Sequence, residues 1–299
     1  MVDLVEQKLN VHYEESEMRF EVINTGISSY SFLLYYLQAK EILPLYSPDL
    51  VVINVDMTDV GNDCLYRRQA VMDDNFLPEA ILADANPNLL MTPHGAMPKP
   101  IVFRFDEFFN QYSAAYRHIR AAFRKSAKES IDILGLPAVS KADKLPCDEL
   151  ESDWVTMHPW SDELKRNVGY SMFVLANTIK LLREQNVSVV VTGVPHFPQY
   201  ARGYWAMLRS TREDPDHLPP HPKHAVGPWS TKPHDYLERT TEQASGLFLN
   251  SFEALKPYMI NAKQTDYYYP NDPFHFNIAG NKIWAEAQFR FLLDSGILP

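Results

Sequence analysis

The stretch 49-DLVVINV-55 is a nearly unbroken run of apolar, mostly β-branched residues, and 187-VSVVVTGV-194 repeats the pattern. Runs of this kind are typical of strands that are buried on both faces, as in a parallel sheet. Apolar residues at helical spacing occupy the chain around them and predict helices over 2–9, 32–43, 105–126, 161–185 and 278–293. Strands separated by helices predict an α/β fold, a doubly wound parallel sheet with right-handed crossovers.

Two weaker strands are predicted as well, RFEVINT at 19–25, which ends at Gly26, and LFLN at 247–250. Ser161 is expected to cap the helix over 161–185. Two stretches, around 72–104 and 209–235, are rich in polar residues and proline and break the alternation of helices and strands. We therefore expect one domain over 1–299 with these two stretches as insertions, the usual position of binding loops.

Composition excludes several classes of partner. The chain has 299 residues, 45% of them hydrophobic, and a net charge of −10 with a pI of about 5.5. An acidic chain without a basic patch does not predict a nucleic-acid partner. No apolar run reaches the length of a membrane span, and no glycine-rich phosphate loop follows a strand. We expect no cofactor, and the cellular compartment stays open.

The carboxyl ends of parallel strands meet at one edge of the sheet, where open α/β proteins bind ligands. Four polar, turn-rich segments are expected to meet there: 24-NTGISSYS-31, 56-DMTDVGND-63, 193-GVPHFPQY-200 and 272-DPFH-275. In the last of them Asp272 and His275 stand three residues apart. A carboxylate beside an imidazole is how a general base is oriented for nucleophilic catalysis.

These segments, in this order, resemble the SGNH/GDSL hydrolases, a family of flavodoxin-like esterases and acyl-transfer enzymes. The resemblance covers nearly the whole chain, and the DxxH ahead of the last helix is its most specific element. It implies ester hydrolysis by a Ser–His–Asp triad, with His275 as the base and Asp272 as its orienting carboxylate. The implied substrate is a small-molecule or carbohydrate ester, and no metal is implied.

The resemblance also implies an oxyanion hole. Gly26 takes the position of the family's glycine amide, and a glycine lets the backbone approach a substrate closely. The family's asparagine follows the buried strand in a G-x-N-D pattern, and this register falls on Asp56-Met57-Thr58-Asp59. Thr58 is therefore favoured as the side-chain donor of the oxyanion hole, in the place of the family's asparagine. The alternative is Asn62, which stands in a similar Gly-Asn-Asp group four residues later.

The chain departs from the family in its first block, because no Gly-Asp-Ser occurs anywhere in it. The helix over 2–9 corresponds to the helix that follows that block. We therefore expect the first strand and the nucleophilic serine to lie upstream of residue 1, and this chain by itself to be inactive. Ser28, Ser29 and Ser31 are not expected to replace the missing nucleophile, because they follow the second strand of the family's order, on the oxyanion-hole turn.

Several alternatives remain open at this point. Asp272 and His275 are also compatible with a cap of the last helix. Asp56, Asp59 and Asp63 could gather around Mg²⁺, although Asp59 is expected to be a structural hydrogen-bonding residue. His217, His221 and His224 have a spacing that metal ligands can have, and His196 is either a pocket residue or a buried one. An O-acyltransferase acting on a carbohydrate and a non-catalytic binding protein are the alternative functions.

Overall fold

The computed structural model describes residues 1–27, 30–67, 70–81, 89–92, 95–98, 154–155, 160–200, 231–270 and 272–298. The predicted helix over 105–126 and the histidines at 217, 221 and 224 lie outside these residues. The chain divides into two compact units, one formed by Met1–Leu65 with Glu149–Pro299 and the other by Tyr66–Asp148.

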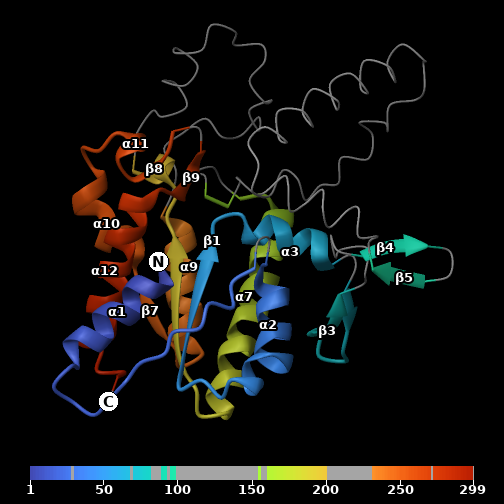
Figure 1. Cartoon of the computed structure of the whole chain (residues 1–299). Helices are drawn as coiled ribbons and strands as arrows, with labels where there is room; N and C mark the ends of the chain where they lie inside the picture. Colours follow the sequence, from blue (N-terminus) through green and yellow to red (C-terminus); the bar gives the residue numbers. More distant parts are fainter. Residues whose placement is uncertain are drawn as a thin grey trace, which may run out of the picture. The chain divides into compact units, whose positions relative to one another are not determined.

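The centre of the first unit is a three-stranded parallel sheet of order β1-β6-β7 (Figure 1). Strand β1 is Leu50–Asp56, β6 is Ser188–Val194 and β7 is Leu247–Leu249. The pairing of β1 with β6 runs without interruption from Leu50 opposite Ser188 to Asp56 opposite Val194. The predicted strands at 49–55, 187–194 and 247–250 are therefore confirmed, and so is a mixed α/β fold with a parallel sheet.

Helices cover both faces of this sheet. Helices α2 (Phe32–Glu41), α7 (Asp162–Glu184) and α9 (Lys232–Gln243) pack together on one face. Helices α1 (Val2–His12), α10 (Ser251–Met259) and α12 (Ile278–Asp294) gather on the other, where Figure 1 shows them side by side. No helix in the described part of the chain is long and apolar enough to cross a membrane.

The four helices predicted within the described residues form with nearly the expected limits, as α1, α2, α7 and α12. The Ser161 hydroxyl accepts a hydrogen bond from the amide of Leu164, 3.1 Å away, and so caps α7 as expected. One face of α7 carries buried apolar side chains, and this face packs on the sheet. Amphipathic spacing therefore locates the helices of this fold well.

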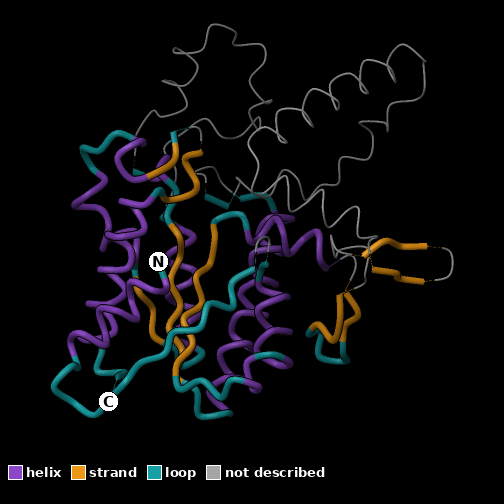
Figure 2. Tube along the Cα trace, viewed as in Figure 1, coloured by secondary structure: helices purple, strands orange, loops and turns teal. Residues whose placement is uncertain are grey.

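The strand predicted at 19–25 does not form. These residues belong to the loop between α1 and α2, drawn in teal in Figure 2. Side chains of α1 bind its backbone: Asn10 exchanges two hydrogen bonds with Phe20, and the Glu6 carboxylate accepts the Val22 amide at 2.7 Å. An alternating sequence becomes a strand only beside another strand, and no described strand pairs with this one.

Short elements complete the described chain. Helix α3 (Asp59–Arg67) follows β1, and η5 (Phe197–Gln199) follows β6. Helix α11 (Gln264–Tyr267) leads into a hairpin of β8 (Tyr268–Tyr269) and β9 (Asp272–Phe276), and η1 is Leu43–Leu45. Two antiparallel pairs lie within the predicted insertion at 72–104 or begin just before it, β2 (Ala70–Met72) with β3 (Pro78–Ile81) and β4 (Leu89–Thr92) with β5 (Gly95–Pro98). The end of the stretch predicted as the second insertion, 231–235, belongs to the start of α9.

Asp63 lies in α3, just after β1, and its buried carboxylate binds residues of two other helices. It is 2% exposed. Its carboxylate accepts hydrogen bonds from the Ser31 hydroxyl at 2.5 Å, the Leu33 amide at 3.0 Å and the Ser171 hydroxyl at 2.7 Å. Ser31 precedes α2 and Ser171 lies in α7, so one carboxylate joins three helices.

Replacing Asp63 with alanine leaves these three donors without their acceptor. A buried donor without a partner costs about 1–3 kcal/mol, so we expect Asp63→Ala to lower the free energy of unfolding by roughly 3 kcal/mol or more. Urea denaturation measures this loss. The control is Asp294→Ala, at the exposed end of α12, which should change stability by less than about 0.5 kcal/mol. Equal stability of the two variants would contradict the role given to Asp63.

Candidate functional site

The hairpin β8–β9 presents the DxxH segment. Tyr268 pairs with Phe276 and Tyr269 with Asp272. The Tyr268 ring is fully buried, and its hydroxyl donates to the carbonyl oxygen of Pro195, which follows β6, at 2.8 Å. Gly280 of α12 lies so close to the hairpin that a Cβ there would stand 2.1 Å from the Tyr267 oxygen. Packing on both sides therefore fixes the hairpin at the carboxyl end of the sheet.

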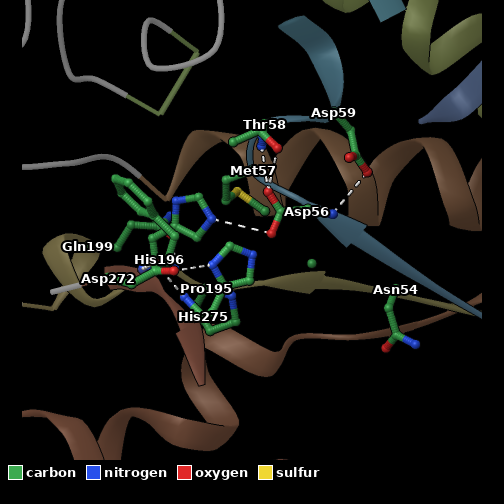
Figure 3. A network of polar contacts seen from close by, with 12 residues as sticks. Asn54, Asp56, Met57, Thr58, Asp59, Pro195, His196, Gln199, Asp272 and His275 are labelled. Carbon is green, nitrogen blue, oxygen red and sulfur yellow. Dashed lines mark hydrogen bonds and ion pairs between the residues drawn. The ribbon is translucent and has the colours of Figure 1, made fainter. Parts of the chain in front are cut away.

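Asp272 and His275 form an oriented imidazole–carboxylate pair (Figure 3). His275 Nδ1 lies 2.6 Å from Asp272 Oδ2, and the amides of Phe274 and His275 donate to Asp272 Oδ1 at 3.0 and 3.2 Å. The carboxylate is thus held from both sides, and Nε2 of the imidazole points away from it. The His275 side chain is 71% exposed, and no described residue hydrogen-bonds to its Nε2.

This pair does not cap the last helix. The N-cap of α12 is Asn277, whose side-chain oxygen accepts the amide of Gly280 at 3.0 Å. The capping explanation for Asp272 and His275 is therefore excluded. Their hydrogen bonds orient an exposed imidazole instead, which is the arrangement a general base requires.

A second imidazole–carboxylate pair links the ends of β1 and β6. His196 follows β6 and is 2% exposed, and its Nε2 lies 3.4 Å from Oδ2 of Asp56, the last residue of β1. The other oxygen of Asp56 accepts hydrogen bonds from the Thr58 hydroxyl at 2.7 Å and the Thr58 amide at 2.9 Å. The sequence placed both residues at this rim and left open whether His196 is buried; only the structure pairs it with Asp56.

The pKa values of two neighbouring carboxyl groups, the half-buried Asp56 and the buried Asp59, are shifted in opposite directions. Burial raises the pKa of Asp56, but the charge and hydrogen bond of His196 and the bonds from Thr58 outweigh it and lower this pKa to about 2. Burial and the charge of Asp56 raise the pKa of Asp59 well above its ordinary value. Asp59 Oδ2 accepts the Tyr35 hydroxyl at 2.7 Å and the Asp56 amide at 2.9 Å, so its expected structural role is confirmed.

The three expected oxyanion-hole residues differ in what their donors do. The Gly26 amide donates to the Asn24 side chain at 3.1 Å, within its own turn. The Thr58 hydroxyl and amide both donate to Asp56. Asn62 lies half-buried in α3, and its side-chain amide donates to no described residue. Of the side-chain donors of Thr58 and Asn62, only that of Asn62 is not bonded to a described residue, and the choice between the two stays a prediction.

The described residues supply neither a nucleophile for His275 nor a metal centre. The hydroxyls of Ser31 and Ser171 donate to Asp63, and that of Ser251 donates to the Gly193 carbonyl. Ser28 and Ser29 lie outside the described residues. In the described ranges no group of three histidine, cysteine, aspartate or glutamate side chains is placed to hold a metal ion.

Comparison of this chain with protein-family models, with curated proteins and with solved structures found no match.

His234, in α9, is buried beneath this rim. It is 1% exposed, and neither ring nitrogen has a hydrogen-bond partner among the described residues. Its Nδ1 stands 2.9 Å from where a Cβ on Gly193 would lie, so a glycine is needed there for α9 to approach β6. Burial, together with the nearby His196, lowers the pKa of His234 to about 3. The folded protein therefore holds this imidazole neutral.

This burial predicts that acid destabilises the fold. The ordinary pKa of histidine is 6.5 and the folded value is about 3, so the unfolded chain binds more protons between these two values. The free energy of unfolding therefore falls as pH drops from 6.5 towards 3, by on the order of 4 kcal/mol from this residue. His234→Leu should remove most of that fall, as measured by urea denaturation at several pH values. His12→Ala, on the surface of α1, is the control; an unchanged pH dependence in His234→Leu would refute the assignment.

Proposed function

We propose that this chain carries the histidine–aspartate part of an esterase centre of the SGNH type, which uses a serine nucleophile. The supporting observation is the 2.6 Å contact between His275 and Asp272, with the free ring nitrogen of His275 turned outward. The pair stands at the carboxyl end of a parallel sheet, where α/β proteins bind ligands. An imidazole held in one orientation by a buttressed carboxylate is the unit that activates a serine.

The proposed nucleophile is a serine upstream of this sequence, on a strand that pairs with the outer edge of β1. The backbone amide of Ser188 donates to the carbonyl oxygen of Asp49, which precedes β1. In a parallel pair every second residue bonds to the same neighbouring strand, so the backbone groups of Leu50 and Val52 point away from β6. Among the described residues nothing hydrogen-bonds to these outward groups. A parallel strand paired there would satisfy them and would run towards the rim where β6 ends; further along this edge the Asn54 oxygen and the Asp56 amide already bond to Tyr35 and Asp59.

The chemistry assigned to the residues follows from these positions. His275 Nε2 accepts the proton of the serine hydroxyl while the oxygen attacks the ester carbonyl, and Asp272 stabilises the resulting imidazolium. His275 then returns the proton to the departing alcohol, which leaves an acyl-serine. Water, activated by the same imidazole, releases the acid. Asn62 is the proposed side-chain donor to the oxyanion. Gly26 is the proposed backbone donor, and to serve it must exchange its hydrogen bond to the Asn24 side chain for one to the substrate.

Transfer of the acyl group to a carbohydrate hydroxyl would use the same acyl-serine, so the dyad is equally compatible with an O-acyltransferase. The two reactions differ only in the acceptor that meets the acyl group. An acylated sugar formed in competition with free acid would identify the transferase. If the protein binds an ester and does not cleave it, the alternative of a non-catalytic binding protein is identified instead.

The test uses the protein expressed together with the coding sequence that precedes Met1. It should hydrolyse p-nitrophenyl acetate, and His275→Ala should lower kcat by roughly 10²–10⁴-fold because no proton acceptor remains. Asp272→Asn should cost less, but still severely, because the imidazole loses its orientation. Initial rates of p-nitrophenol release measure both.

His12→Ala serves as the matched control, because it removes an exposed histidine from α1, and it should hydrolyse the ester at the wild-type rate. Folding of each variant is checked by its thermal transition. Wild-type turnover in a folded His275→Ala variant, or a preceding sequence that encodes no strand with a serine, would refute the proposed centre.

A further inference from the structure

His196 is an unusual residue for its position. It follows β6 at the edge of the core, and its backbone is clamped by Gln199, whose side-chain oxygen accepts the His196 amide at 2.8 Å and whose amide donates to the His196 carbonyl at 3.0 Å. A buried site of this kind usually holds an apolar side chain. A histidine here carries a desolvation cost, which its contact with Asp56 offsets.

The ring of His196 also packs on the segment that holds the catalytic pair. The centroids of His196 and Phe274 lie 4.7 Å apart with an angle of 48° between the ring planes. Phe274 stands between Asp272 and His275, and its amide is one of the donors that hold the Asp272 carboxylate. A shift of the Phe274 ring therefore moves the turn in which the imidazole is oriented.

Asp272 fixes the orientation of the His275 ring, but both residues belong to the same turn. The His275 side chain is largely exposed, so its position depends on how β9 is anchored. On the α12 side the anchor is Phe276, which packs on Trp284 and leaves no room for a side chain at position 280. On the sheet side the contact is Phe274 on His196, which is in turn paired with the end of β1.

We propose that His196 is a positioning residue for the His275–Asp272 pair and acts through Phe274, with Asp56 fixing His196 in place. The inference rests on the proposed function. In it, the contact of His196 with Phe274 sets the distance between His275, the proposed base, and the end of β1. Figure 3 shows the two pairs at this rim, Asp56 with His196 and Asp272 with His275. Misplacing a catalytic group by about 1 Å can cost on the order of 10²-fold in rate.

The first readout needs no turnover. A proton shared in a short imidazole–carboxylate bond gives a strongly downfield NMR resonance, and its loss in His275→Ala assigns it to the His275–Asp272 pair. In His196→Leu and in Phe274→Leu we expect this resonance to move upfield or to broaden beyond detection. Asp56→Asn, which keeps the shape of the side chain but removes its charge, should produce a smaller shift in the same direction.

Leu237→Ala is the matched control. Leu237 is fully buried in α9 and takes no part in the contacts between Asp56, His196, Phe274 and Asp272, so its truncation should destabilise the protein while the resonance keeps its wild-type position. An unchanged resonance in a folded His196→Leu variant overturns the proposal. If that variant does not fold, Phe274→Leu decides, and an unchanged resonance there overturns it equally.

The second readout separates this proposal from the proposed function. In the protein carrying its preceding sequence, His196→Leu should lower kcat about 10–100-fold and leave KM within about threefold. If the resonance responds but no form of the protein cleaves esters, the positioning role stands and the esterase centre is refuted. If esters are cleaved and kcat does not change in His196→Leu, the positioning role is refuted and the esterase centre stands.

Discussion

The parallel pairing of β1 with β6 is the constraint on which the rest of the structure depends. Because the two strands run in register to their last residues, Asp56 and the segment that begins at Pro195 emerge at the same edge of the sheet. The Asp56–His196 pair and the hydrogen bond from Tyr268 to Pro195 both use this edge. The hairpin that carries His275 is thereby seated on the carboxyl ends of strands that lie far apart in the sequence.

The polar groups at this edge divide into two kinds. Asp59 and Asp63 are buried, and their oxygens are occupied by hydroxyl and amide donors that hold helices to the sheet. Asp272 binds backbone amides with one oxygen and a single exposed imidazole with the other. The first kind stabilises the fold, whereas the second keeps an imidazole in one orientation and open to solvent. This difference separates Asp272 and His275 from the other acidic residues at the rim.

Patterns in the sequence locate the elements that bury their own apolar residues. The runs at 49–55 and 187–194 and the amphipathic helices α7 and α12 are of this kind. The sequence does not predict helix α9, because it is mostly polar and has a proline as its second residue, or helix α10, because Pro257 lies inside it. The segment 19–25 has the alternation of a strand but lacks a partner among the described strands, so α1 side chains bind its backbone instead.

The site shows the same division. The spacing of Asp272 and His275 was enough to predict their contact, because both lie in one turn. The pairing of His196 with Asp56 joins residues that are 140 positions apart, and only the register of the sheet brings them together. The preference for Thr58 followed the order of residues along the chain, whereas its hydroxyl is taken by Asp56 in space. Local spacing thus predicted the dyad, and the rest required the fold.

The most direct test of the central claim is to label the protein, expressed with its preceding coding sequence, with a fluorophosphonate and to locate the modified residue by mass spectrometry. The account predicts one modified serine, upstream of Met1 on the strand that pairs with β1, and no labelling in His275→Ala. Modification of Ser28, Ser29 or any other serine of this chain, or no modification at all, would contradict it.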